Sequence, residues 1–140
     1  MSVVVGIDGS EGSIKALRWA LDEARRRATA LRVVHAWGMP YGPAMAGYVP
    51  VPEPPLYDAA REGAQEVLDH ALAAIDPDGV EVEPLLVEGN PVAALLEAAG
   101  EDGLIVVGSR GRGGFAGLLL GSVGQQLVHH AHRPVVIVPK

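Results

Sequence analysis

Short runs of branched apolar residues alternate along the chain with longer stretches whose apolar residues recur every three or four positions. A short continuous apolar run is typical of a strand buried on both faces, and the longer spacing is typical of an amphipathic helix. The short runs predict strands at residues 2–8, 30–37, 80–89, 103–108 and 134–139. The spaced stretches predict helices, with their caps, at residues 10–28, 58–75, 90–100 and 121–131.

The alternation of strands with helices decides the fold class. Ser10 and Asn90 are expected to cap two of the helices, with Pro91 in the first turn of the second, because their side chains accept hydrogen bonds from unpaired N–H groups. Strands separated by helices form a mostly parallel sheet that is covered on both faces. We therefore expect an α/β fold in which residues 1–140 form a single domain, since the chain shows no internal repeat.

The charge balance argues against some classes of function. The chain carries 11 Lys and Arg against 17 Asp and Glu, and this net charge of −6 argues against a general binder of nucleic acid or of an anionic membrane. No apolar run approaches the ~20 residues of a membrane span, and the first residues show no signal-peptide pattern. Since there is also no cysteine, we expect a cytoplasmic protein without disulfides or a thiolate metal site.

A glycine-rich stretch follows the strand predicted at residues 103–108. Seven of the eighteen glycines lie between Gly108 and Gly124, inside a C-terminal segment, residues 103–140, that has no Asp or Glu. In open α/β sheets, ligands bind beyond the carboxyl ends of the strands. Asp8 lies at the carboxyl end of the first strand, so it faces the same crevice as the glycines if the first and fourth strands are neighbours.

The spacing of this stretch carries a family resemblance. Gly108, Gly111, Gly121 and Ser122 form the pattern Gly-x2-Gly-x9-Gly-Ser, which resembles the nucleotide-binding signature of the ATP-binding branch of the universal stress protein family. The resemblance covers essentially the whole chain, including "VVVGIDGSEGSIKALRWA", "VVHAW" and "LIVVGSRGRGGFAGLLLGSVGQQLVHHAHRPVVIVP". It implies a Rossmann-like open sheet of five parallel strands in the order 3-2-1-4-5, ATP as the ligand, and a homodimer formed through strand 134–139.

Bare backbone suits a phosphate site, because N–H groups surround a phosphate only where side chains do not intervene. Gly108 and Gly111 would let the chain turn tightly under the triphosphate. Gly121, Ser122 and Val123 would offer N–H groups at the start of the last helix, where the helix dipole favours an anion. The alternative is a flexible surface linker that ends in a glycine cap.

Four more residues follow from the resemblance. Asp8 would contact the adenosine end of the nucleotide, and Val107 would pack near the ribose and phosphates. Gly6 and Ala36 would line the adenine pocket. For Asp8 the alternative is a local cap on the turn that follows its strand. Mg²⁺ would bridge the phosphates without a cluster of protein ligands.

Other chemistry finds less support in the residues. A Walker A loop needs Gly-Lys-Ser/Thr, and the lysines are Lys15 and Lys140. His129, His130 and His132 are close in sequence, but neighbouring residues of a helix point to different sides, which favours surface roles over a metal site. Two functions stay open: a stress-response module regulated by bound ATP, and a slow ATP hydrolase that needs a partner. The first is favoured because the sequence offers a phosphate cradle without an evident base.

The segment at residues 38–57 differs from the rest in composition. It holds six of the eleven prolines and all three tyrosines, and its one charged side chain is Glu53. Long connections without regular structure are uncommon in compact domains and tend to be functional or mobile. We expect a lid over the ligand or a partner-binding surface here, with disorder as the alternative.

Overall fold

A computed structural model of the chain describes residues 1–38, 54–109 and 121–140. Its strands are β1 (Val3–Gly6), β2 (Leu31–Trp37), β3 (Val82–Glu88), β4 (Leu104–Gly108) and β5 (Val135–Val138). Its helices are α1 (Glu11–Arg27), α2 (Pro54–Ala73), α3 (Pro91–Ala99) and α4 (Ser122–His130). The strands form one sheet in the order β3-β2-β1-β4-β5, and every neighbouring pair is parallel. The predicted order 3-2-1-4-5 is confirmed.

The boundary of α2 differs most from its prediction. The helix begins at Pro54 instead of residue 58, so the expectation of irregular chain through residue 57 is wrong over this turn. Proline suits the first turn of a helix, where its missing N–H has no intrahelical acceptor, and Tyr57 packs against Trp37 of β2. The rest of the segment predicted as a lid or partner surface, residues 39–53, lies outside the described residues.

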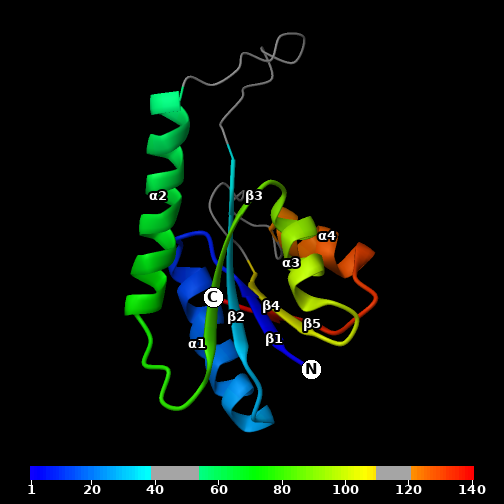
Figure 1. Cartoon of the computed structure of the whole chain (residues 1–140). Coiled ribbons are helices and arrows are strands. Elements are labelled where there is room, and N and C mark those ends of the chain that lie inside the picture. Colours follow the sequence, from blue (N-terminus) through cyan, green and yellow to red (C-terminus); the bar gives the residue numbers. More distant parts are fainter. Residues whose placement is uncertain (39–53, 110–120) are drawn as a thin grey trace.

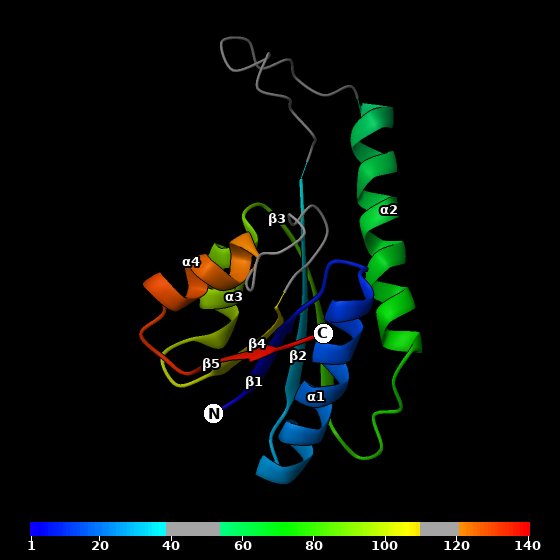
Figure 2. The same cartoon turned by 180° about the vertical axis from the view of Figure 1, so that it is seen from behind.

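Helices cover both faces of the sheet. Figures 1 and 2 show α1 and α2 on one face and α3 and α4 on the other. Alternate residues of β1 point to opposite faces, so Val3 and Val5 pack in the core beneath α1, while Val4 packs with Leu95 of α3 and Leu127 of α4. This explains why the strand is apolar at successive positions. Within the described ranges, no helix is long and apolar enough to span a membrane.

The parallel arrangement gathers the carboxyl ends of the strands at one edge of the sheet. β1 and β4 are neighbours, with Val3 opposite Leu104 and Val5 opposite Val106. The chain leaves β1 at Gly6 toward α1, and it leaves β4 at Gly108. The turn that carries Asp8 and the residues at the end of β4, Gly108 and Ser109, therefore share the edge at which α/β sheets bind their ligands.

Candidate functional site

The turn after β1 is held by Asp8 and two serines. One carboxylate oxygen of Asp8 accepts hydrogen bonds from the Ser10 backbone N–H (2.9 Å) and the Ser10 hydroxyl (2.5 Å). The Ser10 hydroxyl oxygen in turn accepts from the backbone N–H of Ser13 (3.2 Å), as an N-cap of α1. The local capping role of Asp8 is therefore confirmed. Contact between Asp8 and an adenosine stays a prediction.

Gly108, at the end of β4, is needed for close packing. A Cβ atom at this position would lie 3.0 Å from the backbone oxygen of Gly12 in the first turn of α1. A side chain would therefore require the backbone of α1 at Gly12 to shift by a few tenths of an ångström. From the sequence, Gly108 is predicted to allow a tight turn under the phosphates. The structure adds a second reason for glycine at this position, the close approach of α1 to β4.

Gly6 and Val107 lie side by side under α3. A Cβ atom on Gly6 would lie 3.1 Å from a methyl carbon of Leu95 and 3.5 Å from a methyl carbon of Val107. Val107 itself is 5% exposed. Both residues therefore lie at the carboxyl ends of β1 and β4, with Leu95 of α3 packed over Gly6 and with Val107 buried beside it. Contact of either residue with a nucleotide stays a prediction.

The backbone of Ala36 faces the space beyond the end of β1. The carbonyl of Val34 accepts the Ile7 N–H at 2.9 Å, which is the last backbone hydrogen bond between these two parts of the chain. Residues of a strand direct their backbone N–H and C=O groups alternately to the two neighbouring strands. The N–H and C=O groups of Ala36 therefore point to the same side of β2 as those of Val34. Trp37 points the other way, since its carbonyl accepts the Gly89 N–H at 2.8 Å. Ala36 thus offers one donor and one acceptor toward the carboxyl edge of the sheet.

The start of α4 is built differently from the starts of α1 and α3. Gly121 is the N-cap, in extended conformation (φ −75°, ψ 174°), and no side chain of the described residues caps it. Its N–H donates to the carbonyl of Ser109, just after β4, and its own carbonyl accepts the first helical hydrogen bond from Gln125. The first N–H groups of a helix have no intrahelical acceptor, so Ser122 and Val123 present theirs at this edge.

The structure brings most of the predicted residues to one place. Gly6, Asp8, Val107 and Gly108 lie at the ends of two neighbouring strands, and Gly121 is tied to that edge through Ser109. Ser122 is exposed and Val123 is partly buried. Gly111 lies outside the described residues, as do Arg110 and Arg112.

Sequence reasoning missed a cluster of three side chains at the same edge. The rings of Trp37 and Tyr57 pack with centroids 5.4 Å apart and planes inclined by 59°. The Tyr57 hydroxyl donates to a carboxylate oxygen of Glu88 at 2.8 Å, and this hydrogen bond raises the pKa of Tyr57 above its ordinary value. A signal existed in the sequence, because Trp37 and Glu88 are the last residues of strands that proved to be neighbours.

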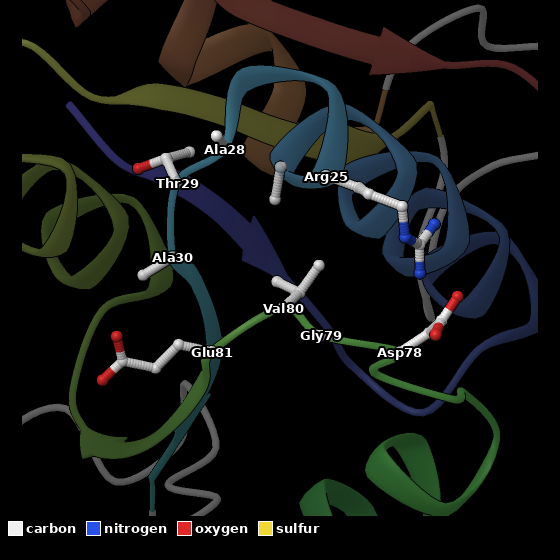
Figure 3. Close-up of a pocket in the computed structure, with 9 residues that line it drawn as sticks. Arg25, Ala28, Thr29, Ala30, Asp78, Gly79, Val80 and Glu81 are labelled. Carbon is white, nitrogen blue, oxygen red and sulfur yellow. The ribbon is translucent and has the colours of Figure 1, made fainter.

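A recess at the opposite edge of the sheet has different chemistry. It has a volume of about 420 Å³ and lies between the end of α1, the start of β2 and the chain that leads into β3. Figure 3 shows Arg25 and Asp78 at one end and Glu81 at the other. Arg25 already donates to the carboxylate of Asp22 at 2.9 Å and to the carbonyl of Pro77 at 3.4 Å. None of the predicted site residues lies here.

The histidines at the end of α4 point to solvent. His129, His130 and His132 are all exposed. Across residues 1–38, 54–109 and 121–140, no three His, Cys, Asp or Glu side chains are grouped as ligands for a metal ion.

Comparisons with known proteins agree with the fold. The model of the universal stress protein family matches residues 1–139. Universal stress protein Rv2623 of Mycobacterium tuberculosis is 39% identical over 139 residues, which cover 96% of this chain and 44% of the relative. The chain therefore spans less than half the length of the curated relatives that it matches first.

Two solved structures are similar over nearly the whole chain. The universal stress protein from Archaeoglobus fulgidus in complex with dAMP is 28% identical, with a TM-score of 0.65 and coverage of 99% of this chain and 97% of that one. A universal stress protein in complex with cAMP is also 28% identical, with a TM-score of 0.65 and coverage of 99% and 96%. From the family model, the relatives and the sheet order together, we conclude that this chain belongs to the universal stress protein family.

Proposed function

We propose that this protein binds an adenine nucleotide, with ATP as its ligand, at the carboxyl ends of β1 and β4, and that it acts as a nucleotide-dependent module of a stress response. The observation that carries the proposal is the start of α4, where Gly121 provides no side-chain cap. The dAMP and cAMP complexes of related proteins support a nucleotide as the ligand.

The phosphates lie at the start of α4 in this proposal. The N–H groups of Ser122 and Val123 donate to phosphate oxygens, and the Ser122 hydroxyl adds one hydrogen bond. The positive end of the helix dipole stabilises the anion, and residues 103–140 contain no Asp or Glu to repel it. Gly111 completes the cradle as the sequence predicts. Mg²⁺ accompanies the phosphates, which supply its oxygen ligands together with water.

The base lies at the end of β2. Adenine offers a ring-nitrogen acceptor beside an amino donor, and the peptide groups of Ala36 offer one donor and one acceptor toward that space. Gly6 lines the adenine pocket together with Ala36, and Val107, which lies beside Gly6, packs near the ribose and phosphates. Asp8, which Ser10 fixes at the turn after β1, contacts the adenosine between the base and the phosphates.

The proposal is tested by titrating purified protein with ATP in a calorimeter and by following the bound nucleotide with Mg²⁺ over hours. We expect one ATP per chain that persists without hydrolysis. Steady conversion of ATP to ADP would favour the alternative function, a slow ATP hydrolase. Absence of binding at millimolar ATP would overturn the nucleotide site.

We also propose that the protein is a homodimer formed through β5. This strand ends the described sheet on one side, and Val135, Val136 and Ile137 are only partly buried. An apolar edge strand with unpaired N–H and C=O groups tends to pair with another chain. Sedimentation should show a dimer at micromolar concentration, and Val136→Lys should weaken it. A parent protein that sediments only as a monomer would contradict this assembly.

A further inference from the structure

We propose that Trp37, Tyr57 and Glu88 are positioning residues for the base end of the nucleotide site: they fix the last residues of β2 so that the Ala36 peptide groups meet the nucleobase. This inference rests on the nucleotide site proposed above. It assigns a role to a cluster of side chains that takes no part in the proposed phosphate site.

The cluster joins three elements at the carboxyl edge. The Trp37 indole belongs to the end of β2, the Tyr57 ring to the first turn of α2, and the Glu88 carboxylate to the end of β3. Ring packing links Trp37 to Tyr57 at 5.4 Å, and a hydrogen bond links Tyr57 to Glu88 at 2.8 Å. The Gly89 N–H closes the arrangement by donating to the Trp37 carbonyl at 2.8 Å. The three elements therefore hold each other in place.

The end of β2 needs such support because β1 stops earlier. The last residue pair between the two strands is Gly6 with Val34, whereas β2 continues to Trp37 with β3 on one side. Past Val34, the described link back to the end of β1 is the His35 ring, whose Nδ1 lies 2.9 Å from the Ile7 carbonyl. A strand end paired on one side only is prone to fray. The aromatic cluster replaces the bracing that β1 no longer provides.

The cluster braces β2 from the face opposite to the site. Leu31 and Val33 pack in the core beneath α1, so residues of odd number in β2, Trp37 included, face α1 and α2. Val34 and Ala36 pack on the side of α3 and α4. The side chains of Trp37 and Tyr57 thus leave the space beyond β1 open, which makes them positioning residues that act through the Ala36 backbone.

The test separates the base end from the phosphate end with two probes, ATP and inorganic triphosphate, titrated into folded protein. Tyr57→Ala removes both the ring contact and the hydrogen bond. We expect it to lower ATP affinity about tenfold, as the loss of one or two hydrogen bonds would, and to leave triphosphate affinity unchanged. Tyr57→Phe keeps the ring and should weaken ATP about threefold. Gln65→Ala is the matched control, because it removes another α2 side-chain hydrogen bond, to Asp69 at 2.9 Å, away from this edge.

Fluorescence gives a second readout. In a Trp19→Phe background, Trp37 is the remaining tryptophan, and its emission should change with ATP but not with triphosphate. Tyr57→Ala protein that binds ATP as tightly as the parent would overturn the positioning role and leave the proposed function standing. Equal loss of ATP and triphosphate binding would also overturn it, since the defect would then be general. A parent protein that binds neither probe would overturn the proposed function and this inference with it.

Discussion

Helices α3 and α4 lie on the same face of the sheet and both follow the carboxyl end of a strand, but their first turns are built in opposite ways. At α3, the side-chain oxygen of Asn90 accepts the N–H groups of Val92 at 2.8 Å and Ala93 at 3.2 Å. At α4, Gly121 has no side chain to do this. Both helices have nine residues, so their dipoles are alike. The difference lies in the cap: Asn90 caps the start of α3, whereas no side chain of the described residues caps the start of α4.

The other end of α3 is completed by the protein as well. Arg32 of β2 donates to the Ala98 carbonyl at 2.6 Å, and Arg133, after α4, donates to the Leu96 carbonyl at 2.8 Å. Cations at the C-terminus of a helix stabilise it through its dipole. Side chains of this chain therefore make hydrogen bonds to backbone groups at both ends of α3, as expected of a helix with a structural role. Substitutions at the start of α4 can test whether a helix start without a side-chain cap binds the ligand.

The largest effect is expected from Gly121→Val. Valine tolerates the backbone conformation at this position, so the main change is a branched side chain where phosphate meets the N–H groups. Losing two or more charge-assisted hydrogen bonds, each worth roughly 1.5–3 kcal/mol, should lower ATP affinity by about 100-fold or more. Calorimetric titration measures this loss, with circular dichroism and melting temperature as checks on folding.

Ala131→Val is the matched control for this experiment. Ala131 caps the other end of α4 with a similar extended backbone (φ −76°, ψ 134°), so the same side chain is added to the same helix far from its N-terminus. It should bind ATP like the parent. Folded Gly121→Val protein with parental affinity would show that the start of α4 holds no phosphate.

A smaller effect is expected from Gly121→Asn, which gives α4 the cap that α3 already has. The amide oxygen would accept the N–H groups of Val123 and Gly124, the counterparts of Val92 and Ala93. Because the new cap competes with phosphate for the Val123 N–H, ATP affinity should fall about tenfold, while the free energy of unfolding without ligand should rise by a few tenths of a kcal/mol. Titration and urea unfolding measure the two quantities. Tighter ATP binding by this variant would contradict the proposal that phosphate uses the N–H groups that a side-chain cap would occupy.

The fold could be predicted from local patterns because each strand and helix is stabilised by burial of its own apolar residues. The capping roles of Ser10 and Asn90 were also readable, since each cap bonds within its own turn. The start of α2 could not be predicted from the sequence, because Tyr57 in its first turn packs against the ring of Trp37, which belongs to a different element, β2. The family resemblance supplied the strand order, which periodicity alone leaves open.

The candidate site was predicted less completely, for a related physical reason. Gly108 has the place that the glycine signature gives it, but its contact with Gly12 joins parts of the chain far apart in sequence and follows only from the packing of α1 on β4. Tyr57 and Glu88 likewise meet because β3 and the start of α2 lie beside β2. Sequence spacing reports contacts along one element, and these contacts link different elements.

The reciprocal change at α3 is Asn90→Ala, whose effect should fall on stability alone. Removing the cap leaves two N–H groups without their acceptor and should lower the free energy of unfolding by about 1 kcal/mol, whereas Asn90→Gly should lower it by only a few tenths. Urea unfolding measures both variants. ATP affinity should stay within about twofold of the parent, since no ligand contact is lost. An Asn90→Ala protein that loses ATP as strongly as Gly121→Asn would show that the two helix starts are not independent.

Among the changes at the start of α4, the smallest effect on ATP affinity is expected from Ser122→Ala, and it decides whether backbone or side chain distinguishes α4 from α3. The substitution removes one exposed hydroxyl but keeps the N–H of residue 122 and the open position at Gly121. If the site is made mainly of backbone, ATP affinity should fall only about threefold, because water replaces an exposed hydroxyl and the net loss stays within the roughly 0.5–1.5 kcal/mol of an ordinary hydrogen bond. Triphosphate affinity should fall by the same factor, because the hydroxyl belongs to the phosphate end. Titrating both probes into the parent and the variant measures this directly. A 100-fold loss for Ser122→Ala would mean that a side chain holds the phosphate, and the missing cap at Gly121 would then explain nothing about binding.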